Sequence, residues 1–222
     1  MDANQIRFAI FLAIFLLMLG LESVIQRHPT VDVKTRRLKI NLALTGIDIL
    51  VVRLFFGAAA VGAAQFAGER GWGLFNYLEW PEGLETFFCV IILDLMIYIQ
   101  HVVLHMIPFF WRFHIVHHSD LDLDVSSGLR FHPIEILGSM LYKIGLVFAL
   151  GPSTTTVLIF EAILNGMAQF SHSNITLPES LDRLLRYIIV TPDMHRIHHS
   201  VEKEETNSNF GFNLSVWDRI LG

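Results

Sequence analysis

The chain has 222 residues, of which 53% are hydrophobic and only 17% are charged. Intrinsic disorder is excluded, because disordered chains are poor in apolar residues, and a typical soluble domain carries about 25% charged residues. The net charge of −5 gives no reason to expect nucleic-acid binding. A single cysteine, Cys89, excludes an internal disulfide framework and a cysteine-based zinc or iron–sulfur site. The unusual feature is the presence of 11 histidines.

Four apolar stretches indicate an integral membrane protein. They run over residues 8–21, 40–67, 86–107 and 136–170. We interpret the first as a retained anchor, because no small-residue cleavage site of a signal peptide follows it. The last is long enough for a hairpin of two helices that turns at Gly151-Pro152-Ser153. The sequence therefore predicts an all-α membrane protein with about four to five membrane helices, including one re-entering hairpin.

The distribution of basic residues predicts the orientation of these helices. Residues 26–39 carry five lysines and arginines, whereas residues 67–83 carry only Arg70. The positive-inside rule places the first of these loops in the cytoplasm. Counting spans from there, every histidine-rich segment lies on the same, cytoplasmic face.

Nine histidines fall in four short segments. They are His101 and His105; His114, His117 and His118; His172; and His195, His198 and His199. Residues at i, i+3 and i+4 share a face of a helix, so each triplet is expected to converge on one point. Pro108 and Pro192 are placed to begin the helices of the two triplets, with Thr191 as an N-cap.

The number of histidines predicts two metal ions. Nine imidazoles are too many for one ion but fit two ions with four or five nitrogens each. Imidazole suits zinc, copper, iron and nickel alike. A zinc peptidase is disfavoured, because neither triplet contains the glutamate of the HExxH motif. Two irons with open positions can activate O2, which suits attack on an unactivated C–H bond of a lipid.

The histidine motifs resemble those of the sterol desaturase/fatty acid hydroxylase superfamily of integral-membrane di-iron oxygenases, in its bacterial branch. The resemblance covers roughly residues 85–222. Its motifs are Asp94-Leu-Met-Ile-Tyr98-Ile-Gln-His101 with His105, Trp111-Arg112-Phe-His114-Ile-Val-His117-His118-Ser119-Asp120, Arg130-Phe-His132-Pro133-Ile-Glu135, Phe170-Ser-His172-Ser-Asn174, Thr191-Pro192-Asp193-Met-His195-Arg196-Ile-His198-His199-Ser200, and Asn209-Phe-Gly211 followed by Trp217-Asp218.

The resemblance implies a membrane region of four helices with a cytosolic helical cap that holds two irons, which zinc can replace in a preparation. Residues 1–84 are then N-terminal anchor helices and residues 85–222 the catalytic region. The implied activity is O2-dependent hydroxylation or desaturation of a fatty acyl or sterol-like lipid, in the bacterial inner membrane. One departure is Ala168, where relatives often carry a second histidine four residues before His172. That coordination position is either open or filled by His132.

Five further side chains are candidates for metal ligands or for hydrogen-bond partners of the ligands. They are His132, Asp94, Asp120, Glu161 and Asn165. Asp94 lies two turns before His101 on the same helix face, and its alternative role is an ion pair with Arg53 or Lys143. The aromatic residues near the first triplet, Phe109, Phe110, Trp111 and Phe113, are typical of an interfacial aromatic belt. A role as a substrate gate is the alternative, which the sequence does not indicate.

The predicted enzyme needs reducing electrons from elsewhere. The sequence contains no haem domain, iron–sulfur cysteines or Gly-rich dinucleotide motif, so we expect a separate electron-donor protein at the cytoplasmic face. Two other functions stay open at this point. One is a metal-dependent membrane hydrolase that uses a zinc-bound water, and the other is a membrane metal-binding protein without catalytic activity.

Overall fold

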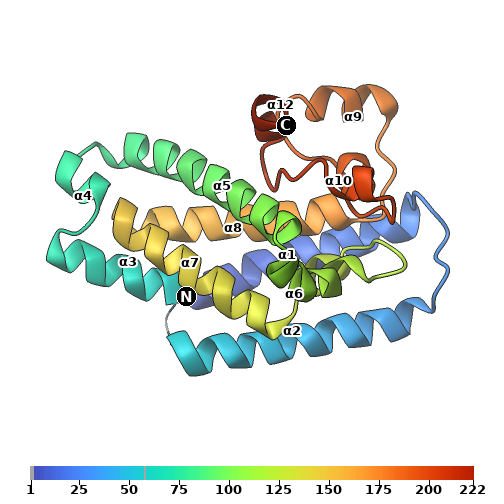
Figure 1. The fold of residues 1–222 in the computed structure, drawn as a ribbon, viewed down its shortest axis with the longest axis horizontal. Coiled ribbons are helices and arrows are strands. Elements are labelled where there is room, and N and C mark those ends of the chain that lie inside the picture. The colour runs from blue at the N-terminus through green and yellow to red at the C-terminus, as the bar shows by residue number, and fades with distance from the viewer. Residues whose placement is uncertain (1–2, 58) are drawn as a thin grey trace.

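Helices make up nearly all the regular structure of the protein (Figure 1). The computed structural model describes residues 3–57 and 59–222, and within these ranges the strand-like pairings are two isolated bridges, Gln26–Ile175 and Ile189–Leu214. The helices are α1 Ala3–Val24, α2 Lys34–Phe56, α3 Ala59–Arg70, α4 Leu74–Leu78, α5 Glu82–Met106, α6 Pro108–His118, the 3-10 turn η1 Ser127–Leu129, α7 Pro133–Leu150, α8 Thr154–His172, α9 Glu179–Leu185, α10 Pro192–His198, α11 Lys203–Thr206 and α12 Val216–Leu221. The all-α prediction is confirmed.

Four segments in the described part of the chain are long and apolar enough to cross a membrane. They are Gln5–Val24, Lys34–Leu78, Glu82–Met106 and Pro133–Leu150. The predicted hairpin is formed by α7 and α8. Gly151 ends α7 in the left-handed conformation at φ +64, and the Ser153 side chain caps α8 by accepting a hydrogen bond from the Thr156 N–H.

The second apolar stretch, expected as one span over residues 40–67, is divided into two helices. Gly57 ends α2 with a φ of +56, a conformation that glycine adopts at little steric cost. The following helix, α3, packs against α7 and α8. The chain therefore leaves the line of α2 within the apolar region.

Three charged residues inside the apolar helices form an ion triad. The buried carboxylate of Glu161 on α8 lies 3.0 Å from the guanidinium of Arg7 on α1 and 3.2 Å from the ammonium of Lys143 on α7. Glu161 precedes His172 by 11 residues, which is about 16 Å along a helix. Glu161 was a candidate metal ligand or hydrogen-bond partner of the ligands, and its observed partners are instead Arg7 and Lys143. Asn165 donates to the Glu161 carbonyl at 2.7 Å and is part of the same helix surface.

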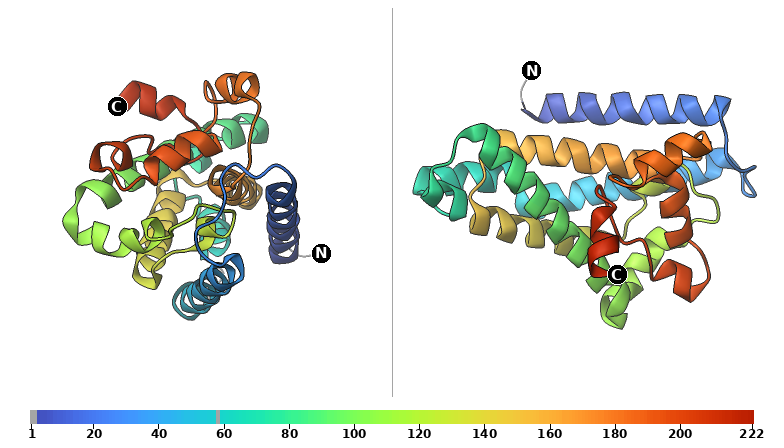
Figure 2. Two further views of the ribbon diagram at one scale, coloured as in Figure 1. Left: turned by 90° about the vertical axis from the view of Figure 1, so that its right-hand side faces the viewer. Right: turned by 90° about the horizontal axis from the view of Figure 1, so that it is seen from above.

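Helices α6 and α9–α12 gather at one end of the bundle (Figures 1 and 2), and we call them the cap. The basic loop between α1 and α2 contacts the same end. The Arg27 N–H donates to the Asn174 carbonyl at 3.0 Å, and the Arg27 guanidinium lies 3.2 Å from Asp193. The basic loop and the histidine segments therefore share one end of the molecule, as predicted. That this end faces the cytoplasm remains a prediction from the positive-inside rule.

A buried arginine holds the segment that joins α6 to α7. The Arg37 side chain, 3% exposed, donates to Asp120 at 2.7 Å and to Asp124 at 2.8 Å. Burial opposes ionisation of Asp120, but the hydrogen bonds from Arg37 and Ser127 outweigh burial and lower the pKa of Asp120. Asp120 was a candidate partner of a histidine ligand, and its observed partners are instead Arg37, Asn41 and Ser127.

Substitution of this arginine should destabilise the protein strongly. Arg37→Ala leaves buried aspartates without their cation, a change that costs about 3–5 kcal/mol of unfolding free energy. Thermal unfolding in detergent is the measurement. The matched control is Arg36→Ala, because the neighbouring Arg36 side chain is 71% exposed. Equal melting temperatures for the two variants would contradict the assigned role of Arg37.

Candidate metal centre

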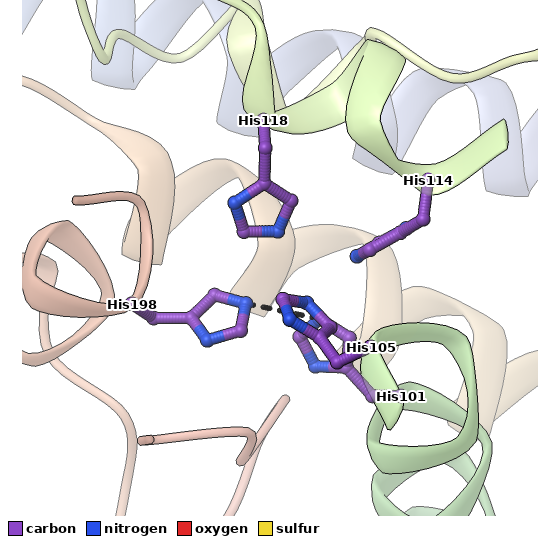
Figure 3. Close-up of side chains that lie close together, drawn as sticks. All are labelled: His101, His105, His114, His118 and His198. Carbon is purple, nitrogen blue, oxygen red and sulfur yellow. Dashed lines mark hydrogen bonds between the residues drawn. The ribbon is translucent and has the colours of Figure 1, made fainter. Parts of the chain in front are cut away.

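Nine histidines converge where the cap meets the membrane helices, and their ring nitrogens form two groups. Within each group the candidate ligand atoms all lie within 4.8 Å of one another. The first group, shown in Figure 3, is His101, His105, His114, His118 and His198, and the second is His117, His172, His195 and His199. These are the nine histidines predicted from the sequence, and their division into five and four matches the expected number of nitrogens per ion.

Each triplet contributes to both groups, so the expectation that a triplet converges on one point was wrong. In the first triplet, His114 and His118 belong to the first group and His117 belongs to the second. In the second triplet, His195 and His199 belong to the second group and His198 belongs to the first. The reason is that successive residues turn by about 100°, which places i+3 and i+4 on opposite sides of i. The predicted helix starts at Pro108 and Pro192 are confirmed.

The two groups touch each other. The ring of His118 from the first group stacks on the ring of His199 from the second, with ring centroids 4.2 Å apart and an interplanar angle of 14°. The nine side chains thus form one compact centre with two positions for a cation.

In the first group, two imidazole lone pairs face each other. His101 Nδ1 lies 2.8 Å from the Phe210 carbonyl, and His198 Nδ1 lies 2.8 Å from the Ser208 carbonyl. A carbonyl only accepts, so both Nδ1 atoms carry the proton and both Nε2 atoms of the neutral rings carry a lone pair. The two Nε2 atoms are nevertheless 3.1 Å apart, joined by the dashed line in Figure 3.

The same arrangement occurs in the second group. His117 Nδ1 lies 3.2 Å from the Arg130 carbonyl, and His172 Nδ1 lies 2.7 Å from the Ala168 carbonyl. Their Nε2 atoms are 3.0 Å apart. With both Nδ1 atoms donating to carbonyls, this contact also lacks a proton.

A metal ion accounts for both contacts. Two lone pairs at this distance repel each other unless a cation lies between them. Imidazole binds a metal such as zinc at about 2.1 Å, and two such nitrogens at right angles around one ion are about 3.0 Å apart. Further buried ring nitrogens have no hydrogen-bond partner: both of His105, both of His118, Nε2 of His114 and Nδ1 of His195. The donor set therefore fits a metal ion in each group.

Burial keeps the cap histidines in the form that binds metals. It lowers the pKa of His117, His195, His198 and His199, and the neighbouring imidazoles lower it further. The rings are therefore neutral at physiological pH. Neutral imidazole is the form that donates a lone pair to a metal.

Comparison with known proteins agrees with this geometry. A model of the fatty acid hydroxylase family matches residues 86–222, which is more than half of the chain and contains all nine histidines. The chain belongs to the fatty acid hydroxylase family. The family resemblance inferred from the sequence motifs is thereby confirmed.

Several curated relatives are named as hydroxylases or monooxygenases of lipids. The ornithine lipid hydroxylase OlsE of Rhizobium tropici is 32% identical over 148 residues, which covers 65% of this chain and 43% of that protein. The alkylglycerol monooxygenase of Caenorhabditis elegans is 26% identical over 190 residues, which covers 83% of this chain and 36% of that protein. The human cholesterol 25-hydroxylase is 26% identical over 136 residues, which covers 61% of this chain and 49% of that protein. The chain thus spans less than half the length of these relatives. No solved structure matches it.

One carboxylate that sequence reasoning left without a role belongs to the centre of this family member. The buried Glu135 carboxylate on α7 accepts from His114 Nδ1 at 2.8 Å. A carboxylate on the second ring nitrogen fixes the tautomer and orientation of a metal-binding histidine. The signal for Glu135 in the sequence was its place in the motif Arg130-Phe-His132-Pro133-Ile-Glu135, three residues after His132.

His132 itself lies outside both groups. Its Nδ1 accepts from the Ile134 N–H at 3.1 Å and caps the N-terminus of α7. His132 therefore does not fill the position that Ala168 leaves without a histidine side chain. Ala168 contributes its carbonyl instead, as the acceptor for His172.

The observed contacts of Asp94 match neither of its two predicted roles. Its Oδ2 accepts from the indole N–H of Trp217 at 2.8 Å and from the Leu214 N–H at 3.2 Å, so its described partners are neither a histidine ring nor Arg53 or Lys143. Asp94 thereby anchors the C-terminal segment to α5. That segment supplies the Ser208 and Phe210 carbonyls to the first group.

Loss of this anchor should loosen the C-terminal segment. Trp217→Phe removes the indole N–H and leaves a buried carboxylate short of a donor, which costs about 1–3 kcal/mol. We expect a lower melting temperature and faster proteolytic cleavage after residue 200. Trp80→Phe, at the opposite end of α5, is the control. Unchanged cleavage in the Trp217 variant would show that Asp94 does not hold this segment.

Proposed function

We propose that this family member is an O2-dependent lipid hydroxylase whose two histidine groups each hold one iron ion. The pairs of facing Nε2 atoms at 3.1 Å and 3.0 Å carry the proposal, because a cation in each group would remove the repulsion between their lone pairs. Iron, when bound, supplies the activation of O2 and the attack on an unactivated C–H bond. Zinc can occupy the same nitrogens in a preparation.

The residues of the chain orient the ligands and exclude water. Backbone carbonyls and Glu135 hold Nδ1 protons, so that the Nε2 lone pairs point into the groups. Phe131 stacks on the His117 ring with centroids 4.6 Å apart, and the buried Phe210 contacts the His105 and His198 rings. These aromatic walls favour oxidation of the substrate over reaction with solvent.

The substrate class follows from the relatives and the apolar helices. The relatives are named for an ornithine lipid, an alkylglycerol and cholesterol, all of them molecules of membranes. Their names describe hydroxylases and monooxygenases, which favours oxygen insertion over desaturation for this chain. We propose a membrane lipid as the substrate, presented to the site from the bilayer.

The remaining parts of the proposal concern organisation and partners. Residues 1–84 serve as membrane anchor helices and residues 85–222 as the catalytic region. The cap faces the cytoplasm, in a bacterium beneath the inner membrane, because the basic loop lies at the same end. A separate electron-donor protein docks there and supplies the two electrons that each O2-dependent hydroxylation consumes.

The decisive test follows oxygen from ¹⁸O₂ into lipid. The protein is expressed in bacterial cells under ¹⁸O₂, and extracted lipids are compared by mass spectrometry with those of cells that express His198→Ala. We expect a lipid that has gained one ¹⁸O atom only with the wild-type protein, because His198 belongs to the first group. His28→Ala, at an exposed histidine outside both groups, should keep full product.

Two outcomes would contradict the proposal. Product oxygen derived from water, or a lipid cleaved by water, would favour the zinc hydrolase. Bound metal without any lipid product, in cells that also express a reductase and a range of candidate lipids, would favour a metal-binding protein without oxygenase activity.

A further inference from the structure

A cavity of about 310 Å³ lies between α5, α6 and α7, beside the first histidine group. Its lining is almost entirely apolar and includes Phe109, Phe110 and Phe113 of α6 and Gly138 of α7. These phenylalanines were expected to form an interfacial belt. The volume is at the lower end of the range for small-molecule sites, roughly 300–1,000 Å³, so the cavity suits part of a lipid better than a whole one.

The cavity opens toward the bilayer. Two of its three walls, α5 and α7, are helices long and apolar enough to span a membrane. Phe109 is 59% exposed, and a Cβ atom added at Gly138 would meet no atom within 4 Å. The side of the cavity near Phe109 and Gly138 is therefore in contact with lipid when the helices are in a membrane.

Hydrogen bonds join α5 to α7 on the side of the cavity away from the cap. There the Gln100 amide donates to the Ser139 hydroxyl at 2.7 Å, and the Tyr142 hydroxyl donates to the Met96 carbonyl at 3.2 Å. Both hydrogen bonds tie α5 to α7. These contacts hold α5 and α7 together on that side of the cavity, which favours entry of a ligand from the side.

The cavity shares its inner wall with the proposed metal centre. On α5, Gln100 and Leu104 line the cavity while the adjacent His101 and His105 belong to the first group. On α6, Phe113 lines the cavity while the adjacent His114 belongs to the first group. Glu135 lines the cavity and also accepts the hydrogen bond from His114. One layer of side chains thus lies between a molecule bound in the cavity and the histidines of the first group.

We propose that this cavity binds a segment of the acyl chain of a membrane lipid, which enters sideways from the bilayer and lies against Glu135, the lining residue that is hydrogen-bonded to His114. The inference rests on the proposed lipid hydroxylase function and assigns its substrate-binding surface. An acyl chain is favoured because the lining is almost entirely apolar and its few polar side chains are mostly engaged: Gln100 with Ser139, Tyr142 with the Met96 carbonyl and Glu135 Oε1 with His114. The lining thus offers little to a charged headgroup.

The glycine in the wall makes the proposal testable by filling the cavity. Gly138→Leu places a branched side chain into the cavity, and in a helix leucine is more favourable than glycine, so the variant should fold. Gly145→Leu is the matched control, because Gly145 is also on α7 with no atom within 4 Å of an added Cβ, yet it does not line the cavity. Gly138→Ala adds a single methyl group and should give an intermediate effect.

The probe is a phosphatidylglycerol with a photoactivatable diazirine on one acyl chain, mixed into phosphatidylcholine vesicles that contain the protein. After illumination, mass spectrometry of peptides locates the label. We expect labelling of the α6 segment at Phe109–Phe113, reduced about tenfold or more in Gly138→Leu, because displacing a few buried methylenes changes affinity by that factor. Gly145→Leu should leave it unchanged.

Three results would overturn the proposal: no label on α6 in the wild-type protein, equal labelling in Gly138→Leu, or an equal loss in Gly145→Leu. This readout needs neither iron nor turnover, so it is separable from the hydroxylase test. Labelling that responds to Gly138→Leu in a protein that never oxidises lipid would uphold the cavity as an acyl-chain site and reject the hydroxylase function.

Discussion

Facing imidazole nitrogens are the constraint on which the rest of the structure depends. In each group, two Nε2 atoms lie about 3 Å apart while both Nδ1 protons are committed to backbone carbonyls. Such a pair is repulsive by itself and becomes favourable only around a cation. The fold must therefore present carbonyls at the back of the rings as accurately as it presents the rings themselves.

Distant parts of the chain supply these carbonyls. Those of Ser208 and Phe210 belong to a C-terminal segment that is held on α5 by the contact of Asp94 with Trp217. The carbonyl of Arg130 follows the segment that Arg37 orders. Arg37 on α2 thus acts on the His117 ring indirectly, through the segment that carries the Arg130 carbonyl, whereas the C-terminal segment contacts the rings of His101 and His198 directly.

The sequence predicted the helices, the hairpin and the nine histidines, because helical spacing and composition are local properties. It missed the division of each triplet, since the choice between two groups depends on how α6 and α10 face each other. The backbone carbonyls that accept from the histidine Nδ1 atoms could not be predicted from the sequence, because every residue type carries the same backbone oxygen. Glu161 and Asp94 were misassigned for a related reason: a lone acid in an apolar helix indicates a partner but does not identify it, and the partners lie on α1, α7 and the C-terminal segment.

The central claim is most directly tested by the metal content and metal–nitrogen distances of detergent-purified protein from iron-replete cells. Elemental analysis combined with X-ray absorption should give about two ions per chain, each surrounded by nitrogens at about 2.1 Å. Both ions should be retained in His132→Ala, since His132 is a helix cap. A single ion per chain, no ion, or a ligand shell dominated by oxygen would contradict the account of two histidine-bound metals.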